Sequence, residues 1–299
     1  MIGVGMKEDT TMTRSSRLFA VILLCLATPA IAQDDFIREQ TRLLAEAESS
    51  LAADPADADA TIWKGRRLGY LGRYDEAIAA FEDGERRHPA DPRFARHIGH
   101  RFISLRRFAD AETALARAAA LAAAMPDEVE PDGLPNAAGV PTSTLKGNIW
   151  YHLGLARYLQ GDFAGAARAY AGAAALAHNP DASAAARYWM ALALLRSGEH
   201  PSAEEALAPV SADWTLVENE GYRDLALCLK GELDCEALLA RAREGGGLDL
   251  ATTAYGVSMA RRIAGDDEGA VALLKELAGG DAGAAFGRIA AEQDLDRLR

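Results

Sequence analysis

The sequence lacks any sustained stripe of basic residues. Its 32 Lys and Arg residues are outnumbered by 44 Asp and Glu residues, which gives a formal net charge of −12. Nucleic acids are bound through clustered Lys and Arg side chains that neutralise the phosphate backbone. We therefore expect no nucleic-acid partner.

An apolar run long enough to cross a membrane is also missing. The run at residues 18–27 is shorter than the about 20 residues that a transmembrane helix needs. Its flanks are those of a signal peptide, with a basic start and a small-x-small cleavage site, at Arg14, Arg17, Ala30 and Ala32. We expect residues 1–32 to be removed near Ala32–Gln33. The remaining chain, 33–299, is then exported to the periplasm or secreted, with no membrane span.

Cysteine is scarce, with 3 residues in the chain, and Cys228 and Cys235 are the two that remain after this cleavage. They flank Gly231, so a helix–turn–helix bend can bring the two thiols together. A disulfide closing so short a loop would contribute about 2–3 kcal/mol on the loop-entropy description. The alternative is a pair of small buried side chains.

A repeat of 34 residues sets the expected architecture. Gly65 and Gly99 are separated by this interval, and the residues around them recur at the same offset: Leu68 with Phe102, Tyr74 with Phe108, Ala77 with Ala111 and Phe81 with Leu115. Such a period is typical of solenoids in which helix pairs stack side by side. The sequence therefore predicts an all-α fold.

The helix pairs are expected at about 58–91, 92–125, 147–180, 184–213, 217–245 and 251–278, and a last helix at 281–297 is expected to cap the stack. Residues 126–146 fall outside the period and form an inserted loop. A long loop inside a repeat array is usually functional or disordered. Four acidic residues among prolines and glycines favour an ordered flap near the groove, and the alternative is a surface excursion without a role.

The third pair carries the most complete motif: Trp150, Leu153, Gly154, Gly161, Phe163, Ala166, Tyr170, Ala173 and Pro180. With these residues the chain resembles the tetratricopeptide repeat (TPR) family. The resemblance implies a right-handed α-solenoid that binds ligands on the concave side, which the first helix of each pair lines. The chain also looks like exported bacterial TPR proteins with similar strings around His97, Pro131 and Asn148, a likeness that implies no activity.

Aromatic residues make up 7% of the chain, yet they align in one column of the first helices. Two residues before the small position of successive repeats stand Trp63, His97, His152, Trp189 and Tyr222. Neighbouring candidates for the same wall are Arg66, Arg93, His100, Asn148, Tyr151 and Tyr188. These residue types supply shape, stacking and hydrogen bonds to a bound ligand. The alternative is that Trp63 and Trp189 pack between repeats and that the histidines are hydrogen-bonded fillers.

Three of these residues, His97, His100 and His152, form a histidine cluster that could hold zinc or non-haem iron. Arg93, Arg96 and Arg101 lie nearby and would repel a cation. The same arginines suit an anionic small molecule, such as a carboxylate or phosphate. We therefore expect no cofactor, with a divalent metal at the histidines as the alternative.

The expected function is an exported scaffold that binds a peptide, a protein partner or an anionic small molecule in its groove. The alternative is an enzyme that uses His97, His100 or His152 under the 126–146 loop. The sequence has no nucleophile elbow, phosphate loop or dinucleotide fingerprint, so no catalytic residue is assigned. A third possibility is an envelope assembly component that acts through its convex surface.

Overall fold

The computed structural model describes residues 29–280 and 283–299, so the predicted signal peptide lies outside it up to residue 28. The chain divides into two units, residues 1–39 and 40–299. Helix α1 (Pro29–Ala53) crosses the boundary between them. None of the described helices combines the length and apolarity that a membrane crossing requires.

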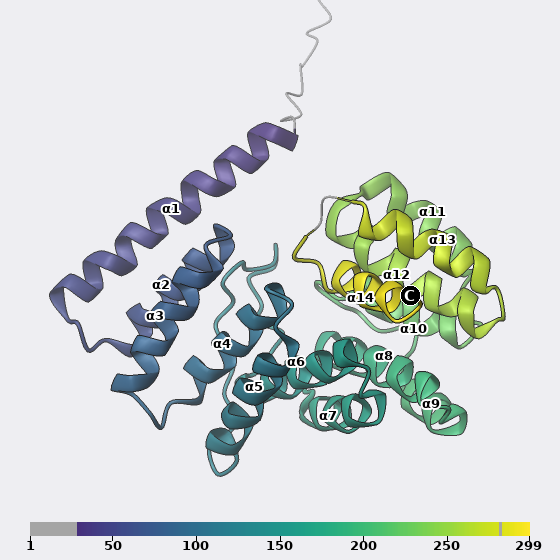
Figure 1. Ribbon diagram of the computed structural model, residues 1–299, viewed down its shortest axis with the longest axis horizontal. Coiled ribbons are helices and arrows are strands. Elements are labelled where there is room, and N and C mark those ends of the chain that lie inside the picture. The colour runs from purple at the N-terminus through teal and green to yellow at the C-terminus, as the bar shows by residue number, and fades with distance from the viewer. Residues whose placement is uncertain (1–28, 281–282) are drawn as a thin grey trace, which may run out of the picture. The chain divides into compact units, whose positions relative to one another are not determined.

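Six helix pairs follow one another in the second unit (Figure 1). They are α2 (Ala58–Tyr70) with α3 (Tyr74–Arg87), α4 (Pro92–Ser104) with α5 (Phe108–Ala122), α6 (Leu145–Gln160) with α7 (Phe163–Leu176), α8 (Pro180–Arg196) with α9 (His200–Leu207), α10 (Glu220–Leu229) with α11 (Cys235–Gly245), and α12 (Gly247–Ile263) with α13 (Asp267–Ala278). Helices of successive pairs contact each other, as α3 does α4 and α5 does α6. The predicted all-α solenoid is confirmed.

Close contact within the first three pairs depends on a glycine of the first helix. Gly65 of α2 faces the ring of Phe81 of α3, and a Cβ at this position would overlap that ring. Phe81 is 1% exposed, so the ring fills the space between the two helices. The glycine lets the helix axes approach, and the large residue of the second helix packs into the space this leaves.

Most turns between paired helices use a glycine in the left-handed region, such as Gly161 with a φ of 88°. The turn between α4 and α5 places Arg106 there instead, with a φ of 61°. Its guanidinium is held by the carboxylate of Glu292, with Nε to Oε2 at 3.0 Å, and by the main-chain oxygen of Gly283 at 2.8 Å. We infer that this long-range contact offsets the backbone strain of the turn.

The last helix, α14 (Phe286–Asp296), folds back onto the stack. It contacts α13 and α12, and also α6 of the third pair. Asp294 of α14 is 1% exposed and accepts hydrogen bonds from Arg196 at 2.6 Å and from Tyr255 at 2.9 Å. The sequence predicted a helix that caps the end of the stack. In the structure this helix also joins distant repeats.

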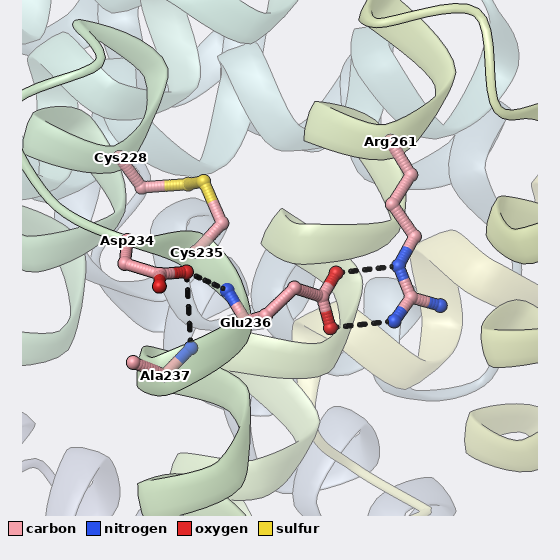
Figure 2. Close-up of a disulfide and its surroundings, with 6 residues drawn as sticks. All are labelled: Cys228, Asp234, Cys235, Glu236, Ala237 and Arg261. Carbon is pink, nitrogen blue, oxygen red and sulfur yellow. Dashed lines mark hydrogen bonds and ion pairs between the residues drawn. A yellow bond between two sulfur atoms is a disulfide. The ribbon is translucent and has the colours of Figure 1, made fainter.

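Cys228 and Cys235 are linked by a disulfide between α10 and α11, with their Cα atoms 5.2 Å apart (Figure 2). Asp234 caps α11, because its carboxylate accepts hydrogen bonds from the main-chain nitrogens of the second and third residues that follow it. Glu236 forms a two-point ion pair with Arg261 of α12, with both N–O distances at 2.7 Å. The disulfide closes the fifth pair, and the ion pair connects that pair to the sixth.

The position of α14 can be tested at Gly287, where a Cβ would overlap the main-chain oxygen of Ala251. Gly287→Ala is expected to lower the free energy of unfolding by about 1–3 kcal/mol, because the backbone of α14 or α12 must shift. Chemical denaturation would measure this loss. Gly283→Ala is the matched control, since no atom lies within 4 Å of a Cβ there. Equal stability of the two variants would contradict the described packing of α14.

Candidate functional site

The three predicted histidines come together on α4 and α6. The ring centroids of His100 and His152 are 4.4 Å apart. The Nδ1–H of His152 donates to the main-chain oxygen of Asn148 at 2.7 Å, because a carbonyl can only accept. For the corresponding reason, the Nδ1 of His97 accepts from the guanidinium of Arg96 at 2.9 Å, which leaves its proton on Nε2.

These histidines are uncharged at neutral pH. Burial lowers the pKa of His97 and of His100 well below the ordinary value of 6.5, and nearby arginines lower it further. Burial and then the charge of Arg96 lower the pKa of His152 to about 3. In the described part of the chain, no three His, Cys, Asp or Glu side chains are arranged to hold a metal ion.

Of the arginines that suited an anionic ligand, Arg93 and Arg96 form ion pairs within the protein, and the guanidinium of Arg101 lies over the ring of Tyr74 at 5.5 Å. Arg93 forms ion pairs with Asp59 and Asp91, both at 2.6 Å. Arg66 donates to the main-chain oxygen of Pro131 at 2.7 Å. The expectation that Arg93 faces a free anionic ligand is therefore corrected, because it joins neighbouring repeats. Arg66, predicted for the groove wall, holds the inserted loop.

The inserted loop, 126–146, is fastened by a buried charge pair. Glu130 is 6% exposed, and its carboxylate lies 3.2 Å from the guanidinium of Arg96. The same carboxylate accepts a hydrogen bond from the amide of Asn148 at 2.8 Å and lies 3.5 Å from the Nε2 of His97. One acidic side chain of the loop thus binds groups from both α4 and α6.

Further along, the loop reaches the segment before α10. The carboxylate of Glu218 accepts hydrogen bonds from the hydroxyl of Thr142 and from the amide of Asn136. The main-chain oxygen of Thr142 accepts from Asn179 at 2.8 Å. The loop therefore runs from α2 past α4 and α6 to the start of α10, which is the path expected of an ordered flap.

Tyr188 and Trp189 belong to the hydrophobic core. Each is 1% exposed, and the Trp189 ring stacks on Tyr170 and Tyr255, with centroids 6.2 and 5.8 Å away. The expectation that both rings line an open groove is corrected, because the helices around α8 cover them.

Trp63 is separate from the histidine cluster. The guanidinium carbons of Arg66 and Arg67 each lie 4.7 Å from its ring centroid. Together with residues of α1 it lines a pocket of about 330 Å³. The residues of the predicted column therefore lie in three different places. Trp189 is in the core, Trp63 is beside α1, and the histidines form a cluster on α4 and α6.

Two adjoining pockets, of about 270 and 550 Å³, form what we call the inner hollow. They share four lining residues: Glu218, Asn219, Tyr222 and Phe286. The smaller pocket also includes the predicted Asn148 and Tyr151, and the larger includes His100. The hydroxyl of Tyr151 donates to that of Tyr222 at 3.3 Å. Among the residues that the structure describes, no Lys or Arg lines either pocket.

Sequence reasoning missed Glu218, Asn219, Asp249 and Phe286. Phe286 reaches the hollow because α14 folds back, and its ring centroid lies 5.7 Å from that of His100. Glu218 and Asn219 fall within the expected fifth pair but precede α10 and occupy no motif position, so the motif gave no sign of them. The buried carboxylate of Asp181 fixes their backbone by accepting from the nitrogens of both residues at 2.9 Å.

The neutral histidines make the fold sensitive to acid. Because the pKa of His152 is lower in the folded than in the unfolded chain, its contribution to stability is complete above about pH 6.5 and is lost as the pH falls toward 3. Each such group should cost about 1.4 kcal/mol per pH unit below 6.5. Urea denaturation between pH 7 and 5.5 should show a smaller slope for His152→Asn. His200→Asn, which replaces an exposed histidine outside the cluster, is the matched control, and an unchanged slope for His152→Asn would contradict the prediction.

The role of the buried ion pair between Glu130 and Arg96 in holding the inserted loop can be tested by substitution. Glu130→Gln leaves the buried Arg96 without its carboxylate, which should cost about 3–5 kcal/mol of stability. Limited proteolysis should cleave residues 126–146 faster in this variant. Glu128→Gln, with an exposed carboxylate in the same loop, is the matched control and should behave as the unchanged chain. Equal cleavage rates for all three proteins would refute the anchoring role of Glu130.

No protein-family model and no curated protein matches the sequence. Among solved structures the chain is similar to MamA of AMB-1, with 18% identity, a TM-score of 0.42, and coverage of 58% of this chain and 92% of MamA. It is also similar to YrrB, a TPR protein with an unusual peptide-binding site, with 13% identity, a TM-score of 0.44, and coverage of 84% and 97%. A third is Naa15/Naa10 bound to HypK-THB, with 17% identity, a TM-score of 0.37, and coverage of 89% of this chain and 39% of the other.

The architecture of the chain follows from its own motif and helices. The small and large residues of the 34-residue repeat meet inside the first three helix pairs, as Gly65 meets Phe81, and the pairs follow one another from α2 to α13. The sequence motif and the stacked helix pairs together make this chain an α-solenoid, and its repeat motif resembles that of the tetratricopeptide family.

Proposed function

We propose that the chain is a protein-interaction scaffold that binds an extended segment of a partner in the inner hollow. The observation that carries this proposal is the shared wall of the two pockets, whose Glu218, Asn219, Tyr222 and Phe286 make one continuous site of them. An extended peptide can occupy both pockets with alternate side chains.

The lining of the hollow suits a peptide. Tyr151, Tyr222 and Phe286 offer ring surfaces that bury apolar groups at a small cost in conformational entropy. The side-chain amide of Asn219 forms no hydrogen bond within the described chain, so it is free to pair with a peptide backbone. Asp181 holds this segment in place before any partner arrives, which reduces the cost of binding.

We also propose that the chain works in an oxidising compartment. The disulfide between Cys228 and Cys235 supports this, since disulfides persist outside the reducing cytosol. The signal-peptide pattern of residues 1–32 supports the same location.

The scaffold proposal is tested by panning a displayed library of peptides, each about 12 residues long, on the immobilised full chain. We expect enriched peptides to bind at least about 30-fold more weakly to Tyr222→Ala and Tyr151→Ala, because truncating a central aromatic contact usually costs at least about 2 kcal/mol. Fluorescence anisotropy would give the affinities, and thermal unfolding would show that the variants fold.

Tyr74→Ala is the matched control, because Tyr74 lies at the start of α3 and lines neither pocket of the hollow. It should leave the affinity unchanged. If no peptide family is enriched, or if the enriched peptides bind all variants equally, the inner hollow is not the binding site.

A further inference from the structure

We propose that the inner hollow selects a partner segment in which a Lys or Arg side chain is flanked by aliphatic residues. This inference rests on the proposed scaffold function and specifies the chemistry of the partner. It is carried by the charge of the pocket walls, by the way in which that charge is held, and by the apolar residues at the rim.

The walls of the larger pocket carry negative charge without cations. Glu218 and Asp249 are both exposed and both line this pocket of about 550 Å³. Neither carboxylate is ion-paired within the described residues. Two carboxylates that face a cavity whose described lining contains no Lys or Arg attract a cation from a partner.

The partners of Glu218 orient its carboxylate but leave its charge uncancelled. Thr142 and Asn136 both donate from neutral groups, a hydroxyl and an amide. The backbone of Glu218 is fixed by Asp181, whose carboxylate is satisfied by main-chain N–H groups. The charge of Glu218 is therefore held in a defined position at the pocket.

A neighbouring acid responds to this negative charge. The pKa of Asp132 in the inserted loop is raised, first by its partial burial and then by the charge of Glu218. The charge of Glu218 raises this pKa more than the charge of Arg66 lowers it, so the charges around Asp132 make the local potential negative. An ammonium or guanidinium group would find the same potential favourable.

The other polar and aromatic groups of the pocket accept a cation as well. Tyr222 and Phe286 offer ring faces, over which Lys and Arg groups are attracted by the ring quadrupole. His100 lines the same pocket, and because burial lowers its pKa it is uncharged and does not repel a cation. Two arginines act on the pKa of His100, and neither lines the pocket: Arg96 is paired with Glu130, and Arg101 lies over the ring of Tyr74.

Exposed aliphatic side chains next to the two acids of the larger pocket are the reason why we expect aliphatic residues beside the Lys or Arg of the partner. Val217, next to Glu218, is 42% exposed, and Leu248, next to Asp249, is 68% exposed. Each acid of the pocket thus has an adjacent aliphatic side chain in contact with water. Residues on either side of a bound Lys or Arg would cover them and remove this apolar area from water.

The experiment uses two fluorescein-labelled peptides that differ at one position, Ala-Leu-Val-Lys-Leu-Val-Ala and Ala-Leu-Val-Glu-Leu-Val-Ala. We expect the full chain to bind the Lys peptide at least about 10-fold more tightly than the Glu peptide at low salt. The difference should shrink as salt is raised, because exposed charges are screened. Free spermidine, as a competitor, tests whether a free organic cation rather than a peptide is the occupant.

Asp249→Asn should weaken the Lys peptide about 3- to 10-fold and leave the Glu peptide no weaker, because it removes one of the two carboxylates at the pocket. Glu205→Gln on α9 is the matched control, since it removes an exposed acid that lines neither pocket. If Glu205→Gln has the same effect as Asp249→Asn, only the net charge of −12 matters and the proposed pocket is wrong.

Equal affinity for the Lys and Glu peptides would overturn the charge preference, and so would the absence of Lys-peptide binding at about 1 mM, a concentration at which even weak complexes form. The scaffold function would still stand if panned peptides bound the hollow through Tyr222. Displacement of the Lys peptide by micromolar spermidine would overturn the assignment to a peptide segment. Failure of both the panning and the paired peptides would refute the scaffold function itself.

Discussion

The buried ion pair between Glu130 and Arg96 determines how the inner side of the solenoid is organised. A buried guanidinium requires a carboxylate nearby, and the one that Arg96 finds comes from the inserted loop. The carboxylate also binds Asn148 of α6 and faces the Nε2 of His97. The loop must therefore cross α4 and α6, and this path brings Thr142 and Asn136 to Glu218, where they form part of the hollow.

The return of α14 supplies the other side of the hollow. Its Asp294 is buried against Arg196 and Tyr255, and its Glu292 binds Arg106 in a turn with a strained backbone. These contacts join residues far apart in the sequence, so they cannot form in a short array of identical repeats. They place the ring of Phe286 against His100 and between the two pockets.

The contacts of the inserted loop place positive and negative side chains in different parts of the molecule. Positive groups such as Arg66 and Arg96 are used to hold the loop, while Glu218 and Asp249 remain at the cavity. The histidines between them stay neutral because burial makes their charged forms costly. The arginines that the sequence offered to an anionic ligand are thus engaged elsewhere, whereas acidic side chains line the larger pocket of the hollow.

The sequence by itself determined the helix pairs and the stack, because the repeat spacing places Gly65 against Phe81 through contacts that are local to one pair. It also placed His100, Asn148, Tyr151 and Tyr222 on the inner helices, where they line the hollow. Tertiary structure alone decided that Trp189 is core, that Arg93 is paired, and that Glu218, Asp249 and Phe286 form the walls. Helical periodicity fixes which face a residue occupies, whereas its partners on that face come from a loop and a helix that lie outside the repeat.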